Sequence, residues 1–211
     1  MRPRAIRAAL VLALLLALVG YFGPWVAHKA AALVLTGQDM GEFVKFLPDV
    51  RSGQLRVVRE LFYLPLLAGS LGLVLSAGNR RLQYRRPIRW LLAVLAAPAA
   101  LSMLPPAWTP QLMMTSEFRW QLAAIALCLG CVLCSPLLKR VAPLVLEVIT
   151  LALALAAGSI PVWQFLRLRP AIDAVYGRPV TLGWGLWLMP AGFGLVVVVL
   201  ALLRVKEGTR A

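Results

Sequence analysis

Three cysteines in the stretch CLGCVLC, namely Cys128, Cys131 and Cys134, have a C-x-x-C-x-x-C spacing that in a loop would suggest an iron–sulfur cluster. Here the stretch lies inside an apolar run that is predicted to be helical. Each step of three residues turns a helix by about 300°, so the three sulfurs spread over a wide arc and over about 9 Å of helix axis. The chain has no fourth cysteine. We therefore expect the thiols to pack as small apolar side chains, with metal or cluster binding and redox chemistry as the alternatives.

Glu147 is an acidic residue well inside another apolar run, six residues after Val141. An ionisable group at that depth in a membrane helix is by default a candidate for function. The tight turn that precedes this run makes Lys139, Arg140, a cysteine thiol or Thr150 the expected partners of its carboxylate. Two interpretations follow: an acid that faces the bundle interior or reaches the interface, or a group that carries a proton or contacts a substrate.

The single histidine, His28, precedes a short segment that carries Asp39 and Glu42. Histidine and carboxylates together can supply acid–base groups or metal ligands, so a lipid-modifying enzyme that uses these three residues is one hypothesis. A lone histidine at a membrane edge is more often a hydrogen-bonded interface residue, and the spacing does not require the three to meet. Thr36 and Asp39 instead have the spacing of a helix-capping pair.

Sequence motifs of several enzyme classes are absent. The chain has no phosphate-binding glycine loop followed by Lys-Ser/Thr, no H-E-x-x-H and no G-x-S-x-G. We therefore expect no catalytic residues, no metal and no cofactor. The net charge of +14 raises the question of nucleic-acid binding, but no RNA- or DNA-binding motif accompanies it. Most basic residues fall between apolar runs, where they set membrane orientation, so no nucleic-acid partner is expected.

The elements that must position these residues are long apolar helices. Of 211 residues, 61% are hydrophobic and 14% are charged, against about 45–50% and about 25% in soluble domains. A bilayer core about 30 Å thick requires about 20 mostly apolar residues per helix. We predict one all-α integral membrane domain over residues 1–211, a polytopic bundle of about six transmembrane helices plus one short interfacial amphipathic helix. The predicted spans are 8–26, 57–77, 88–104, 120–138, 141–163 and 182–203.

Some of these spans leave alternatives open. The first follows an arginine-rich start, so cleavage as a signal peptide is the alternative to a retained span. The third is short and contains Pro98, so incomplete crossing of the bilayer is an alternative for it. The sixth contains GWGLWLMPAGFG, which forms either a kinked packing face or a locally broken helix beside a cavity. Small residues recur at four-residue spacing, as at Ala9, Ala13 and Ala17, and predict close helix contacts.

The short amphipathic helix is predicted over residues 37–47, between the first two spans. Met40, Phe43, Val44 and Leu47 recur at i, i+3, i+4 and i+7 and form one apolar stripe. A helix of this length is marginal alone in water. It therefore lies along the membrane interface, covers a cavity between the spans, or docks another subunit.

Charged and aromatic residues predict the orientation. With the N-terminus inside, the inner side receives the larger share of the 22 Lys and Arg residues, most strongly from NRRLQYRRPIR at 79–89. Both termini are therefore predicted to be cytoplasmic. The excess of Arg over Lys, with abundant Ala, Leu and Gly, is typical of a GC-rich bacterial genome and favours a bacterial inner membrane. The tryptophans predicted at the two interfaces are Trp25, Trp108, Trp120, Trp163 and Trp184 on the outer side and Trp90 on the inner side.

Two functions of different classes remain. The first is a non-catalytic membrane component that acts with partner proteins or with further copies of itself, which short loops and scarce buried polar groups favour. The second is a small permease or channel that is proton-linked through Glu147. The candidate functional residues are Glu147, His28, Asp39 and Glu42. The pattern identifies the lipid bilayer as the medium and leaves substrate and partner open.

Overall fold

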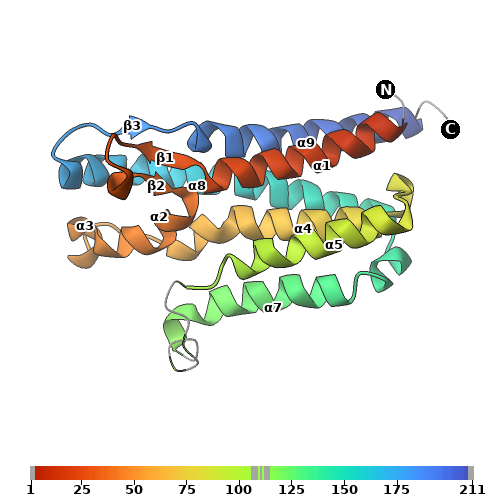
Figure 1. The fold of residues 1–211 in the computed structure, drawn as a ribbon, viewed down its shortest axis with the longest axis horizontal. Coiled ribbons are helices and arrows are strands. Elements are labelled where there is room, and N and C mark those ends of the chain that lie inside the picture. Colours follow the sequence, from red (N-terminus) through yellow and green to blue (C-terminus); the bar gives the residue numbers. More distant parts are fainter. Residues whose placement is uncertain (1–2, 106–108, 110, 112–114, 209–211) are drawn as a thin grey trace.

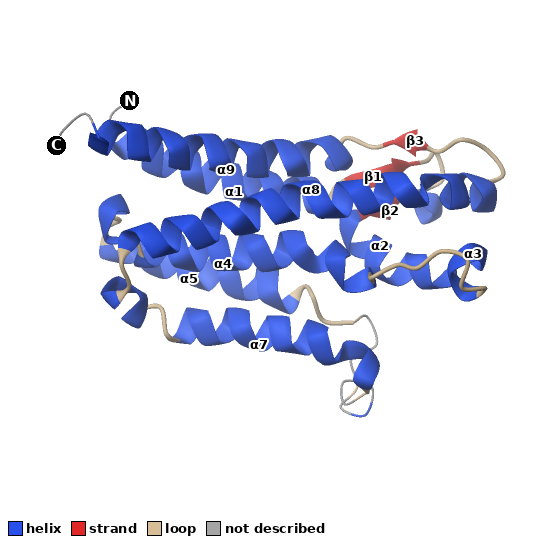
Figure 2. Cartoon of the chain, turned by 180° about the vertical axis from the view of Figure 1, so that it is seen from behind, coloured by secondary structure: helices blue, strands red, loops and turns tan. Residues whose placement is uncertain are grey.

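The computed structural model describes residues 3–105, 109, 111 and 115–208. Within these residues, six long helices run side by side and confirm the predicted all-α bundle (Figure 1). The long helices are α1 (Pro3–Phe22), α4 (Leu64–Gly78), α5 (Arg86–Leu101), α7 (Arg119–Leu133), α8 (Pro143–Tyr176) and α9 (Gly185–Gly208). Helix α4 contacts α1, α5, α7 and α8 and is central, whereas α7 lies at the edge against α5 and α4. Figure 2 shows the same arrangement from behind.

The two ends of the bundle differ in structure. Helix α1 begins and α9 ends at the same end, which we call the terminal end, and η4 (Arg80–Leu82) and η6 (Leu137–Arg140) lie there too (Figure 1). We call the opposite end the sheet end. It carries the strands β1 (Pro24–Ala27), β2 (Leu35–Thr36) and β3 (Thr181–Leu182), the short helices α2 (Gly37–Phe43) and α3 (Pro48–Arg51), and the 3₁₀ helices η1 (Ala31–Leu33), η2 (Val44–Phe46), η3 (Arg59–Tyr63) and η5 (Ser116–Phe118).

Five helical segments of the described chain are long and apolar enough to cross a membrane, which is compatible with a membrane location. They are Ala5–Phe22, Arg59–Gly78, Ser116–Leu133, Pro143–Tyr176 and Gly185–Val205. Helix α5 has 16 residues and spans about 24 Å at 1.5 Å per residue, less than a bilayer core of about 30 Å. Incomplete crossing of the bilayer is the alternative that the sequence leaves open for this helix.

Local sequence sets where the helices end. Helix α1 stops at Phe22, before the predicted limit of 26, because Gly23 and Pro24 follow and the chain then pairs as a strand. Helix α8 continues to Tyr176, well past the predicted 163, and stops at Gly177, whose φ of 64° favours glycine after a helix. Helix α9 continues through Pro190, so the glycine-rich sixth span is an unbroken helix.

The sheet is a feature that the sequence did not predict. Strand β1 lies in the middle and pairs antiparallel with β2 and β3, with Val26 opposite both Leu35 and Leu182. It joins the end of α1 to the segment before α9. Trp25 on β1, which is predicted at the interface, has a fully buried ring that packs against Phe62 and Phe165, so this side chain faces the protein interior. Trp90, Trp120, Trp163 and Trp184 are exposed, whereas Trp108 lies outside the described residues.

The amphipathic helix over 37–47 is present as α2 followed by η2. The Asp39 N–H donates to Thr36 Oγ1 at 3.3 Å and the Thr36 N–H donates to Asp39 Oδ2 at 2.9 Å, which is the predicted capping pair. Met40, Val44 and Leu47 are buried. The apolar stripe therefore packs on the bundle, where α2 contacts η3 and α1 and covers the sheet end.

Candidate functional site

Glu147 is the most buried charged side chain of the described residues, with 1% of its surface exposed. It lies four residues after Pro143, the first residue of α8, and so about 6 Å along the axis from the terminal end of that helix. Arg81 Nη1 donates to its two carboxylate oxygens at 3.1 and 3.3 Å. Asn79 Nδ2 donates to Oε1 at 3.1 Å, and Arg204 Nε lies 3.6 Å from Oε2. We call these four residues the Glu147 cluster.

The partners reach the carboxylate from two places, the α4–η4 turn and the end of α9. Asn79 is the residue that ends α4 and precedes η4, and its side-chain oxygen accepts from the Arg81 N–H at 2.9 Å. This bond fixes the turn that aims both side chains at α8. Arg204 comes from the last turns of α9. At the terminal end, the Glu147 cluster therefore joins α8 to the α4–η4 turn through charge-assisted hydrogen bonds and to α9 through an ion pair.

The expected partners of Glu147 were wrong. Lys139 and Arg140 make no ion pair with it in the described structure. The Thr150 hydroxyl donates to the Leu146 carbonyl at 2.7 Å, one turn back on its own helix. The cations that contact Glu147 come from η4 and α9, which are distant in sequence, and the sequence pattern assigns these cations only to membrane orientation.

A second polar cluster lies at the sheet end, and we call Glu42, Lys45, Arg59, Glu60 and Glu117 the sheet-end ion network. Arg59 is 8% exposed. Its guanidinium lies 3.1 Å from Glu42 Oε1, 3.3 Å from Glu60 Oε1 and 3.3 Å from Glu117 Oε1. Burial lowers the pKa of Lys45, but hydrogen bonds to Glu42 and Glu117 outweigh it and raise that pKa above its ordinary value. The network ties α2, η2, η3 and η5 together.

No local sequence pattern marks Arg59 as the centre of this network. The Arg59 guanidinium stacks over Phe118, with 4.6 Å from Cζ to the ring centroid, and its Nη2 donates to the Glu117 carbonyl oxygen at 2.7 Å. The Tyr63 hydroxyl donates to Glu42 Oε1 at 3.2 Å. The Glu42 carboxylate is therefore bound by Tyr63, Arg59 and Lys45, and the two cations balance its negative charge.

His28 and Asp39 are also held by local contacts. His28 Nδ1 accepts from the Ala30 N–H at 3.0 Å, and its Nε2 meets the guanidinium of Arg178. Both ring nitrogens are thus occupied. Asp39 Oδ2 accepts from the backbone N–H and from the hydroxyl of Thr36. His28, Asp39 and Glu42 share one end of the bundle but make no hydrogen bond or ion pair with one another in the described structure, and Glu147 lies at the other end.

The three cysteines differ in burial along α7 and at Cys134, the residue that caps it. Cys128 is buried, Cys131 is half-buried and Cys134 is exposed, and all three are free thiols. Among the described residues, no three His, Cys, Asp or Glu side chains gather closely enough to hold a metal ion.

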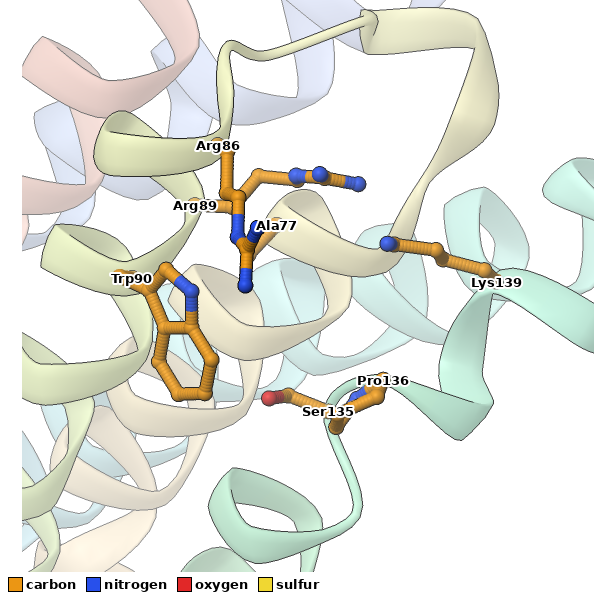
Figure 3. A pocket seen from close by; sticks show the side chains of 7 residues that line it. All are labelled: Ala77, Arg86, Arg89, Trp90, Ser135, Pro136 and Lys139. Carbon is orange, nitrogen blue, oxygen red and sulfur yellow. The ribbon is translucent and has the colours of Figure 1, made fainter.

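One further cavity opens at the terminal end between α4, α5 and the segment from Ser135 to η6, with a volume of about 270 Å³. Figure 3 shows its lining, with Arg86, Arg89 and Trp90 on one side and Ser135, Pro136 and Lys139 on the other. Ala77 of α4 completes it. We call it the basic pocket.

Comparison with known proteins finds no matching family model, no matching curated protein and no matching solved structure.

Proposed function

We propose that this chain is a multi-pass integral membrane protein of a bacterial inner membrane that acts as a non-catalytic component beside partner proteins. The observation that carries the proposal is that the buried carboxylate of Glu147 is held by Arg81, Arg204 and Asn79. A residue that carries protons must change its charge during each cycle. In the Glu147 cluster, loss of the carboxylate charge would remove the negative charge that lies against Arg81 and Arg204, and this cost opposes such a protonation cycle.

The other candidate residues support the same proposal. Acid–base or metal chemistry requires a side chain with a free nitrogen or oxygen that faces a reacting group. The ring nitrogens of His28 and the carboxylates of Asp39 and Glu42 instead serve turns, caps and ion pairs. In the middle of the bundle, the buried hydroxyl of Ser70 donates to the Ala96 carbonyl at 2.9 Å, so this polar group is also satisfied internally.

The proposed orientation has the terminal end in the cytoplasm. The described side chains there include Arg80, Arg85 and Arg140, all exposed, while most of the described carboxylates lie at the sheet end. Positive charge is retained on the cytoplasmic side during insertion. The proposal therefore places α2, α3 and the sheet on the outer side.

A small permease or channel is the second candidate, because one buried polar group of the Glu147 cluster makes no hydrogen bond in the described structure. Arg204 Nη2 is buried and has no hydrogen-bond partner in the described structure. Such a group would suit an anion or a proton path near the terminal end.

One experiment separates the two candidates. The purified chain is reconstituted in vesicles that contain a pH-sensitive dye, and proton flux is measured under an imposed gradient for the parent and for Glu147→Gln. A non-catalytic component gives no flux above protein-free vesicles. Flux through the parent that is lost in Glu147→Gln, with folding intact, would overturn the proposal.

A second experiment tests whether the chain has a partner protein. Cross-linking in native membranes followed by purification under mild detergent should recover one protein in fixed stoichiometry, and deletion of this chain should lower the level of that protein. Recovery of the chain alone, with no protein depending on it, would count against a component role.

A further inference from the structure

We propose that the basic pocket binds the phosphate group of an anionic membrane lipid. The inference depends on the membrane location of the bundle and not on the absence of catalysis. The pocket gathers three cations from two separate parts of the chain: Arg86 and Arg89 from the first turn of α5, and Lys139 from η6. In the described structure none of the three makes an ion pair with a carboxylate.

The absence of a carboxylate partner in the described structure distinguishes this pocket from the Glu147 cluster and the sheet-end ion network. Arg59 and Arg81 are matched by carboxylates at 3.1 Å, so their charge is already balanced. Arg89 and Lys139 are half-buried, which limits their hydration. Clustered cations that are partly desolvated and unpaired create a positive potential that an anion relieves.

The shape of the site suits a phosphate ester. Guanidinium groups bind phosphate oxygens in pairs, and an ammonium group adds a point charge. The Ser135 hydroxyl lines the same cavity and can donate a further hydrogen bond. The volume of about 270 Å³ equals that of roughly nine water molecules at about 30 Å³ each, which leaves room for a phosphate together with its alcohol.

The surroundings identify a lipid as the source of the phosphate. Trp90 lines the pocket and is 55% exposed, and tryptophan prefers the level of the lipid headgroups. Next to the pocket, Leu91 and Val94 of α5 and Leu137 of η6 are exposed apolar side chains that would face acyl chains. Basic pockets between membrane helices on the cytoplasmic side bind acidic headgroups in the same way.

Binding to lipids of defined headgroup tests the proposal. The purified chain in neutral detergent is titrated with phosphatidylglycerol and, separately, with phosphatidylcholine, and bound lipid is counted by native mass spectrometry. The variant Arg89→Gln/Lys139→Gln removes one cation from each side of the pocket. The matched control, Arg80→Gln/Arg140→Gln, removes two exposed cations from the same end that do not line it.

We expect phosphatidylglycerol to bind the parent and the control, and the pocket variant to bind it about 10- to 30-fold more weakly. Phosphatidylcholine should bind weakly to all three. Equal weakening in both variants would show diffuse surface charge and would overturn the site. Tight binding of inorganic phosphate or glycerol phosphate in the absence of lipid would overturn the lipid assignment. Should the double variant fail to fold, Lys139→Gln must weaken binding and Lys139→Arg must restore it.

These outcomes are independent of the proposed function. A chain that binds no acidic lipid can still be a non-catalytic component, and a chain that conducts protons can still hold a lipid in the basic pocket.

Discussion

The carboxylate of Glu147 lies where three helices end, and its neighbours explain why an acid is tolerated at that depth. Asn79 and Arg81 supply hydrogen bonds from one side and Arg204 supplies a second charge from another. Burial of an acid without such partners is strongly unfavourable. The residue is therefore best understood as a connection between α4, α8 and α9, and the consequence is a measurable contribution to stability.

Replacing Glu147 with Gln should lower the free energy of unfolding by about 1–3 kcal/mol. Removing one partner of a buried ion pair costs about 3–5 kcal/mol when the other charge stays buried. Arg81 and Arg204 are 33% and 40% exposed, so water can solvate them and the loss is smaller. Thermal unfolding in detergent measures the change. Asp49→Asn, an isosteric change at a half-buried carboxylate of the sheet end, is the control and should leave the melting temperature unchanged. An equally unchanged value for Glu147→Gln would refute a structural role.

Tyr84 makes the stability of the terminal end sensitive to alkaline pH. Burial raises the pKa of its phenol to about 12, although the charge of Arg7 acts in the opposite direction. The folded state thus holds the phenolic proton more tightly than the unfolded state, whose pKa is about 10. The contribution of Tyr84 to stability is complete below about pH 10 and is lost as the pH rises towards 12.

The variant Tyr84→Phe tests this shift. The difference in phenolate absorbance between parent and variant during a pH titration of the folded protein should show an inflection near pH 12. The variant also loses the bond from the Tyr84 hydroxyl to the Arg7 carbonyl at 3.0 Å, so a decrease in stability of about 0.5–1.5 kcal/mol is expected at neutral pH. An inflection near pH 10 would mean that the phenol is solvated.

At the scale of elements, α1 and α9 approach each other closely because small residues face one another. Ala13 and Ala17 of α1 are fully buried. A Cβ placed on Gly192 of α9 would lie 2.7 Å from Ala17 Cα and 2.9 Å from the Ala13 carbonyl oxygen. These are backbone atoms, which cannot move aside as a flexible side chain can. The contact also holds the two terminal helices together at the end where the chain begins and ends.

Gly192→Ala should destabilise the protein by about 1–3 kcal/mol through overpacking, which corresponds to a melting temperature lower by roughly 2–12 °C. Gly194→Ala is a matched control two residues away on the same helix, because a Cβ there meets nothing within 4 Å. That variant should be neutral or more stable by up to about 1 kcal/mol, since alanine favours the helix. Similar melting temperatures for the two variants would contradict the close approach of α1 and α9.

The elements that could be predicted are those whose pattern repeats within the element itself. Apolar length identified the spans, and the spacing of Met40, Val44 and Leu47 identified α2. Strands β2 and β3 have two residues each and no period to detect. The continuation of α8 to Tyr176 past a charged stretch was missed for a related reason: it is stabilised by distant contacts such as the bond from Tyr176 to the Leu33 carbonyl at 2.8 Å.

The candidate residues likewise divide into those that a local sequence pattern reveals and those that only tertiary packing reveals. Glu147 could be singled out because a lone acid in an apolar run is unusual, but its partners Arg81 and Arg204 could not, because helix pairing alone decides which cations reach it. Arg59 looked like any interface cation until η3, α2 and η5 were brought together. Partner identity at this level depends on tertiary packing, which a single sequence does not encode in its local pattern.

For the molecule as a whole, the two ends differ in how many carboxylates accompany their basic residues. At the sheet end, the carboxylates of Glu42, Glu60 and Glu117 surround Arg59. At the terminal end, Glu147 faces two arginines, and the basic pocket adds three cations without a carboxylate partner in the described structure. This asymmetry is the physical basis of the proposed orientation, because basic ends are retained in the cytoplasm.

The orientation can be measured with cysteine labelling in a background where the three native cysteines are replaced. Gln54→Cys lies at the sheet end, between α3 and η3, and Arg80→Cys lies on η4 at the terminal end; both positions are exposed. A membrane-impermeant maleimide added to intact spheroplasts should label Gln54→Cys and should label Arg80→Cys only after the membrane is opened. If only Arg80→Cys is labelled in sealed cells, the terminal end lies outside and the proposed orientation is reversed. Equal labelling of both would mean that the two ends do not lie on opposite sides of a membrane, and the assignment of the terminal end to the cytoplasm would be lost with it.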